Sequence, residues 1–271
     1  MKQRIITALL ITPFAIALFL LLPSPAFVAM IGVFCGIAMW EWTRLSGMRQ
    51  RPWRAAVVAL CAAAMLTLYF TSNLWLWWTF IVLGCIAWIG AIFWLRHFPF
   101  AASPTREHTA LKIVAGMLAI LPAFAGLMRI EETQPIPHTW ALYAMALVWV
   151  ADTFAYFAGS RWGKVKLAPQ ISPGKTREGL YGALVGSGIL AAIGGWLLGV
   201  RGTALVLLVL IALVSVAFSV VGDLFESLIK RHAGVKDSGN LFPGHGGVCD
   251  RLDGVFAALP FFALGKALLG L

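Results

Sequence analysis

Charged residues are scarce in this sequence. Asp, Glu, Lys and Arg make up only 12% of its 271 residues, while hydrophobic residues make up 61%. A soluble domain averages roughly 25% charged residues. Because a soluble chain of this length could not bury so much apolar surface, the shortage of charge excludes a soluble protein and indicates an integral membrane protein.

Paired cysteines and alternating apolar patterns are lacking as well. Four scattered cysteines without a C-x-x-C pair support neither a zinc site nor a disulfide framework, and they are typical of isolated buried thiols. The apolar runs are continuous, which favours helices over a membrane β-barrel. The net charge of +10 is typical of cytoplasmic loops beside anionic lipids, so we expect no nucleic-acid partner.

The apolar runs predict an all-α polytopic fold with about nine membrane-spanning helices. A spanning helix needs about 20 mostly apolar residues. The expected spans lie near residues 5–22, 26–42, 55–72, 76–95, 109–128, 139–159, 179–199, 204–223 and 254–270. The first begins like a secretory signal peptide, but its apolar stretch is long for one, so we expect it to be retained. We expect one membrane-embedded domain, with N-terminal spans in 1–138 and the site in 139–271.

The distribution of basic residues predicts the orientation of these spans. With the N-terminus in the cytoplasm, 18 of the 21 Lys and Arg residues fall on the cytoplasmic side. This asymmetry is what the positive-inside rule expects. The two most polar loops, 160–178 and 224–253, also fall on that side.

Two polar stretches interrupt the apolar pattern after residue 140. In "WVADTFAYFAGSRWGK", Asp152 lies within a span, where a carboxylate is costly and usually faces a polar cavity or binds a neighbouring helix. In "SPGKTREG", Lys175 and Arg177 precede a helix start that favours a phosphate, although an ordinary basic loop would look the same. A Walker P-loop is excluded because Pro169 stands where its first glycine is required.

A third stretch combines carboxylates with cations. Asp223 ends an expected span, and Asp250 and Asp253 are three residues apart, so on a helix they share a face. Carboxylates beside cations are typical of Mg²⁺-assisted phosphoryl or nucleotidyl transfer. The run from Pro243 to Gly247 would let backbone amides approach a phosphate, because glycine has no Cβ.

The 27 residues from Ser227 to Asp253 resemble the signature of the phosphatidate cytidylyltransferases, also called CDP-diacylglycerol synthases. That signature has the form S-x-apolar-K-R-x4-K-D-x-small-x2-apolar-P-x-H-G-G-apolar-x-D-R-apolar-D. The matching fixed positions are Ser227, Lys230, Arg231, Lys236, Asp237, Pro243, His245, Gly246, Gly247, Asp250, Arg251 and Asp253. The resemblance extends to the two earlier polar stretches and to the multi-span layout.

This resemblance implies a nucleotidyltransferase that transfers CMP from CTP to phosphatidic acid, forming CDP-diacylglycerol and pyrophosphate in phospholipid biosynthesis. It implies a Mg²⁺-dependent site, with room for K⁺ beside it, facing the cytoplasm from a bacterial inner membrane. A homodimer is one option for the oligomeric state.

The resemblance also implies roles for individual residues. The metal ligands would be Asp223, Asp250 and Asp253. The catalytic residues would be Asp223, Lys230, Arg231, Lys236, His245, Asp250 and Arg251. The residues binding CTP or lipid would be Asp152, Ser172, Lys175, Thr176, Arg177, Ser227, Gly246 and Gly247.

Three other functions compete with this one. A CDP-alcohol phosphatidyltransferase would need a D-G-x2-A-R motif, which is absent. A CTP-dependent polyprenol or lipid kinase would share the nucleotide and the membrane, but would yield a lipid monophosphate and CDP. An anion or lipid transporter would spread polar residues through several spans, whereas here they cluster in the C-terminal half.

Overall fold

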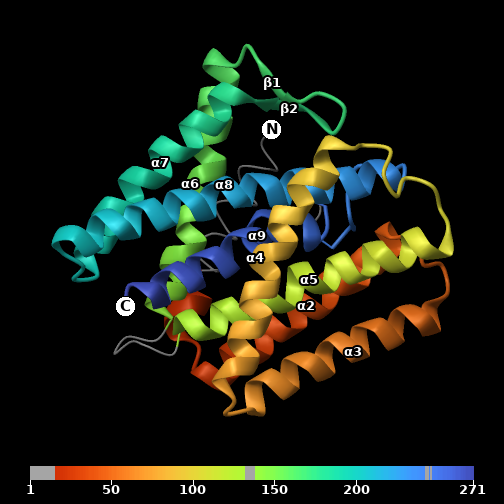
Figure 1. The fold of residues 1–271 in the computed structure, drawn as a ribbon, viewed down its shortest axis with the longest axis horizontal. Helices are drawn as coiled ribbons and strands as arrows, with labels where there is room; N and C mark the ends of the chain where they lie inside the picture. The colour runs from red at the N-terminus through yellow and green to blue at the C-terminus, as the bar shows by residue number, and fades with distance from the viewer. Residues whose placement is uncertain (1–15, 132–137, 242–243, 245) are drawn as a thin grey trace.

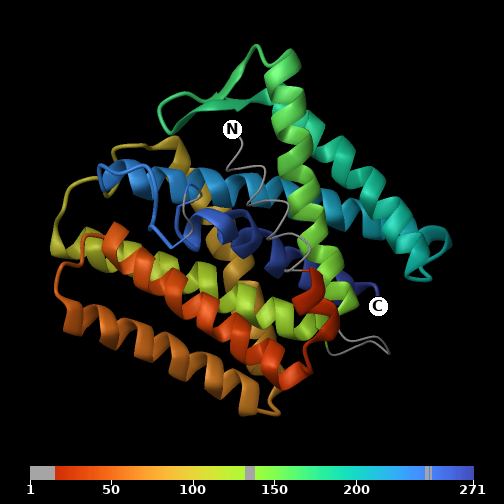
Figure 2. The same ribbon diagram turned by 180° about the vertical axis from the view of Figure 1, so that it is seen from behind.

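The computed structural model describes residues 16–131, 138–241, 244 and 246–271, which form a helical bundle with one small hairpin (Figures 1 and 2). Its elements are α2 (Ser24–Leu45), α3 (Arg51–Phe70), α4 (Leu74–Arg96), α5 (Arg106–Glu131), α6 (Thr139–Trp162), β1 (Lys166–Ala168), β2 (Ser172–Thr176), α7 (Arg177–Leu197), α8 (Gly202–His232) and α9 (Cys249–Leu268). Eight of the nine expected spans correspond to these helices. The first, near 5–22, lies largely outside the described residues.

Seven helices in the described part of the chain, α2 to α8, are long and apolar enough to cross a membrane. This confirms the expected all-α polytopic membrane fold. Helix α9 has 20 residues but is not among the seven, and it carries Asp250, Arg251 and Asp253 near its start and Lys266 in its last turn. The expected ninth span is therefore helical, but charges near both of its ends leave no apolar stretch as long as those of the other seven helices.

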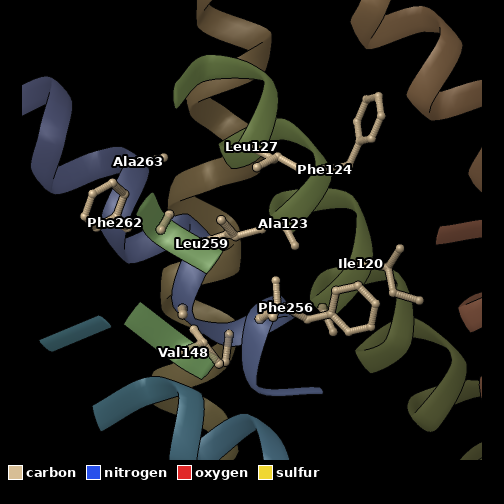
Figure 3. Close-up of a cluster of buried hydrophobic side chains, with 14 of the residues drawn as sticks. Ile120, Ala123, Phe124, Leu127, Val148, Phe256, Leu259, Phe262 and Ala263 are labelled. Atoms are coloured by element: carbon tan, nitrogen blue, oxygen red, sulfur yellow. The ribbon is translucent and has the colours of Figure 1, made fainter. Parts of the chain in front are cut away.

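Helix α9 lies in the middle of the bundle. Figure 3 shows Phe256 and Leu259 of α9 close to side chains of α5, with Val148 of α6 nearby, and the Phe262 ring packs against Trp140 and Tyr143 of α6. All of these side chains are buried. The backbones of α5 and α9 approach so closely that a Cβ on Gly126 would lie only 3.0 Å from the Leu259 carbonyl oxygen. The polar start of α9 is thereby anchored to the most buried part of the protein.

Helices α6 and α7 form a second unit, joined by the β1–β2 hairpin at one end (Figure 1). Their contact depends on glycines, since a Cβ on Gly182 would lie 2.8 Å from the Phe154 carbonyl oxygen and one on Gly186 would overlap the Phe154 ring. This small-xxx-small spacing is common where membrane helices pack tightly. The close packing fixes where the hairpin sits over the rest of the molecule.

One expected helix end is wrong, and one element of the structure was not expected. Helix α8 continues to His232, so Asp223 lies inside a helix and not at its end. The helix persists because Phe225, Leu228 and Ile229 are buried and recur at helical spacing after the continuous apolar run stops. The loop 160–178 contains the antiparallel β1–β2 hairpin, which the sequence analysis did not predict.

Candidate active site

The candidate site forms where four segments meet: the second half of α8, the described residues between α8 and α9 (233–241, 244 and 246–248), the start of α9, and the β1–β2 hairpin. The end of α2 also contacts this site, since Arg44 Nη2 donates a 2.8 Å hydrogen bond to the Ser238 carbonyl oxygen. Most of the residues that the signature singled out lie in these segments. The described ones can therefore be placed individually.

Asp250 organises the loop before α9. Its Oδ1 accepts from Lys230 Nζ at 2.6 Å, and its Oδ2 accepts from the amides of Ser238 at 2.8 Å and Gly247 at 2.7 Å. Burial raises the pKa of the Asp250 carboxyl, but these hydrogen bonds outweigh burial and hold the pKa below its usual value. Both carboxylate oxygens are thus already engaged by the protein.

Lys230 lies between two acids. Its Nζ forms ion pairs with Asp250 and with Glu226, one helical turn earlier on α8. The Glu226 side chain is almost completely buried, with 2% of its surface exposed. Lys230 therefore neutralises buried carboxylates in this structure, and its expected catalytic role stays a prediction.

Asp223 lies at the centre of a second group of charges. Lys175 of the hairpin forms an ion pair with it, and Ser227 Oγ donates to its Oδ1 at 3.4 Å. Asp152 of α6 and Asp253 of α9 interact with it electrostatically as like charges. Three helices and the hairpin thus bring carboxylates and a cation together around Asp223.

Asp253 differs from Asp250, although they share a face of α9. Among the described residues, the Asp253 side chain accepts at Oδ1 from the adjacent Gly254 amide, at 2.7 Å, and from no other donor. Burial, followed by repulsion from Asp223 and Glu226, raises the pKa of the Asp253 carboxyl well above its usual value. A cation bound here would relieve that repulsion.

Gly246 and Gly247 pack against carboxylate side chains of the protein itself. A Cβ on Gly246 would overlap Asp250 Oδ2, and a Cβ on Gly247 would overlap the carboxylate of Glu41. Gly246 also has a φ of 81°, in the left-handed region that favours glycine. These two glycines make room for side chains of α9 and α2, and their expected contact with substrate phosphate stays a prediction.

Glu41 of α2 is a site component to which the sequence analysis assigned no role. It is 7% exposed, and its carboxylate accepts from the Val248 amide at 3.1 Å, the Cys249 amide at 2.9 Å and Ser238 Oγ at 2.8 Å. Its one sequence signal is an acid inside an apolar run, in "MWEWT". Ser238 was missed too, because its partners Glu41 and Asp250 are distant in sequence.

The remaining expected residues lie around this centre. Thr176 is buried and caps α7, its Oγ1 accepting from the Gly179 amide at 3.1 Å, while Arg231 Nε donates to the Ile171 carbonyl oxygen at 3.2 Å. Ser172 lies in β2, opposite Ala168. Four of the expected cations are exposed at the surface, namely Arg177, Arg231, Lys236 and Arg251. His245 and Pro243 lie outside the described residues.

Comparison with known proteins adds an independent line of evidence. A family model described as the cytidylyltransferase family matches residues 2–268. A phosphatidate cytidylyltransferase of Pseudomonas aeruginosa is 40% identical, covering 97% of this chain and 96% of its own. Another from Haemophilus influenzae is 34% identical, covering 97% of both chains. A third, from Bacillus subtilis, is 46% identical over 45% of each chain.

The family match and the first two relatives span the apolar N-terminal helices as well as the charged C-terminal segments. The family match covers α2 to α9 and includes every residue placed in the site. The chain therefore belongs to the cytidylyltransferase family.

Proposed function

We propose that this protein is a phosphatidate cytidylyltransferase of the membrane, which transfers CMP from CTP to phosphatidic acid. The products are CDP-diacylglycerol and pyrophosphate. The observation that carries the proposal is the 40% identity to an enzyme of that name over 97% of the chain. The charge cluster around Asp223, in a bundle of apolar helices, supports the same conclusion.

The reaction joins two phosphates that repel each other. A lipid phosphate oxygen, already anionic, attacks the α-phosphorus of CTP, and the bond to the β-phosphate oxygen breaks as pyrophosphate leaves. Because such a nucleophile needs little base catalysis, the protein must mainly position the reactants and neutralise charge. The exposed cations Arg177, Lys236 and Arg251, together with Lys175, are our candidates for holding the phosphates.

The residues present fit a Mg²⁺ ion held by two carboxylates. No group of three or more His, Cys, Asp or Glu side chains that could hold a metal occurs among the described residues. Mg²⁺ is, however, usually bound by one or two carboxylates, with water and substrate phosphates as further ligands. We assign this role to Asp223, whose partners Lys175 and Ser227 are side chains, and to Asp253, which it repels. Asp250 is not assigned, because backbone amides hold its Oδ2 in the loop. When bound, the ion would neutralise phosphate charge.

We further propose that the site faces the cytoplasm of a bacterial inner membrane. The basic residues of the loops favour this orientation, and the relatives described above are bacterial. CTP would then enter from the aqueous side, while the acyl chains of phosphatidic acid stay between apolar helices. A second cation such as K⁺ and a homodimer remain expectations of the resemblance, with no residues assigned to them.

One reaction tests the proposal directly. The purified protein, in detergent with phosphatidic acid, is given CTP labelled in the cytosine ring, with and without Mg²⁺. We expect the label to move into the lipid fraction as CDP-diacylglycerol, together with one pyrophosphate per labelled lipid, only when Mg²⁺ is present.

Other results of the same reaction would refute the proposal. A lipid or polyprenol kinase would leave phosphatidic acid unlabelled and, with diacylglycerol or polyprenol supplied as acceptor instead, would leave the label in soluble CDP and produce an unlabelled lipid monophosphate. A transporter would leave CTP intact. The Glu107→Gln variant, altered at an exposed position of α5, serves as a control that should retain full activity.

A further inference from the structure

Glu41 stands out as a buried acid that the reaction does not use. It belongs to α2, in the N-terminal half of the chain, yet its hydrogen-bond partners follow residue 237 in sequence. Its contact with Ser238 joins positions 197 residues apart. Among the described residues its hydrogen-bond donors are all neutral: one hydroxyl and two backbone amides.

The carboxylate of Glu41 caps helix α9 from another helix. The amides of Val248 and Cys249 lie at the start of α9, where no helical carbonyl can accept from them. No side-chain cap is provided by Val248 itself. A negative charge at a helix N-terminus is also favoured by the helix dipole. Glu41 therefore replaces the cap that the local sequence does not supply.

The same carboxylate is coupled to Asp250 through Ser238. Ser238 Oγ lies 2.8 Å from Glu41 Oε2 and 2.8 Å from Asp250 Oδ2. A hydroxyl has a single proton, so this group links the two carboxylates while donating to one at a time. The loop between α8 and α9 is thus held on one side by Asp250 and on the other by Glu41.

The loop is shaped to admit this side chain. A Cβ on Gly239 or on Gly247 would overlap the Glu41 carboxylate, so both glycines leave a space that Glu41 fills. Cys249 Sγ, fully buried beside it, donates to the Ala38 carbonyl oxygen of α2 at 3.1 Å. The end of α2, the loop and the first turn of α9 form one closely packed contact.

We propose that Glu41 is a positioning residue for the active site, and this inference rests on the proposed function. It holds the start of α9, and with it the Asp250 and Asp253 carboxylates, in register with Asp223 on α8. The N-terminal helices are in this view a part of the site's architecture and not only a membrane anchor.

The experiment compares Glu41→Gln with the wild type, using Glu107→Gln as the control. Gln keeps the size of the side chain but turns an NH₂ group toward amide or hydroxyl donors. We expect kcat to fall about 10- to 100-fold and the KM for CTP to change less than kcat, because Lys175, Arg177 and Lys236 stay in place while the carboxylates at the start of α9 are displaced. Unchanged kcat would overturn the proposal.

A second readout does not depend on activity. All four cysteines are buried, and Cys249 alone lies beside Glu41. In Glu41→Gln we expect N-ethylmaleimide to label Cys249 at least about 10-fold faster, while Cys35, Cys61 and Cys85 stay protected, since only the local contact opens. Continued protection of Cys249, or equal labelling of all four, would overturn the proposal.

The Glu41→Asp variant keeps the charge on a side chain one methylene shorter. It should give intermediate kcat and intermediate Cys249 labelling, and wild-type values of both would contradict the proposal. It also carries the test if Glu41→Gln fails to fold. Failure of the wild type to form CDP-diacylglycerol would refute the proposed function, whereas the labelling pattern would still report on Glu41.

Discussion

At the scale of single residues, Asp250 and Asp253 show how neighbouring acids on one helix face take on different tasks. Asp250 accepts from Lys230, Ser238 and Gly247 and stabilises the loop. Asp253 has one short-range donor and lies among other acids. Their spacing on one face of α9 predicted a single shared role. Their different hydrogen-bond partners instead indicate two different roles.

This difference predicts opposite stability effects for two matched substitutions. Asp253→Asn removes a carboxyl whose ionisation is opposed by burial and by neighbouring acids, so the melting temperature should stay equal or rise, while activity should fall at least ~100-fold with the loss of the proposed metal ligand. Asp250→Asn should destabilise the protein by about 3 kcal/mol, because it leaves Lys230 with one acid and turns an amide toward backbone donors.

Thermal unfolding and CDP-diacylglycerol formation, measured on the same preparations, check both expectations. Excess Mg²⁺ should not restore the Asp253→Asn variant. Near-normal activity in this variant would remove Asp253 from the assigned metal site, and an unchanged melting temperature for Asp250→Asn would contradict its role in the loop.

The sequence could predict many of the residues in the site, but not how they are paired. Signature residues such as Asp223 and Asp250 stood out because charges are rare in this chain. Glu41 did not, because one acid in an apolar run gives no indication of partners that follow residue 237. Lys230 was expected at the substrate, and its burial between Glu226 and Asp250 depends on tertiary packing.

At the scale of elements, apolar runs predicted helices well and predicted their ends poorly. The eight runs after residue 24 all became helices, because length and hydrophobicity are local properties. The end of α8 was misplaced by nine residues, since charged residues such as Asp223, Glu226 and Lys230 interrupt the apolar run although the helix stays buried through Lys230. The short β1–β2 hairpin depends on cross-strand pairing, for which its few residues carry no clear signal.

The glycines of α7 give a prediction at this scale. Alanine is the better helix former by up to about 1 kcal/mol, so Gly188→Ala, with only Leu213 at 3.5 Å, should be neutral or stabilising. Gly182→Ala should instead destabilise by about 1–3 kcal/mol, because its Cβ meets the Phe154 backbone of α6.

Unfolding of the two variants by denaturant in detergent compares them within one helix. Gly182→Ala should also lower activity. A displaced α7 moves the hairpin, whose Lys175 forms an ion pair with Asp223. Equal stability of the two variants would show that α6 and α7 can separate without cost.

At the scale of the whole molecule, the orientation in the membrane can be tested with the chain's own chemistry. The four native cysteines are buried and should not react with a membrane-impermeant maleimide. Single cysteines at exposed positions on opposite sides, Asn240→Cys and Thr203→Cys, then report the topology. In intact cells Thr203→Cys should be labelled, and Asn240→Cys should be labelled only after the membrane is opened.

Labelling of Asn240→Cys in intact cells would reverse the proposed orientation and place the site on the outer side. Labelling of both positions would indicate a mixed topology. Neither result would alter the contacts within the site, because these contacts are the same whichever side of the membrane the site faces.

The contact between Glu41 and the start of α9 also sets an order of events during synthesis. Helix α2 leaves the ribosome early, whereas Val248 and Cys249 follow more than 200 residues later. Until these residues have been synthesised, the Glu41 carboxylate lacks the amides of Val248 and Cys249 as hydrogen-bond donors. The site can form only after α9 has been synthesised and has reached α2, so a chain interrupted before Val248 cannot form it.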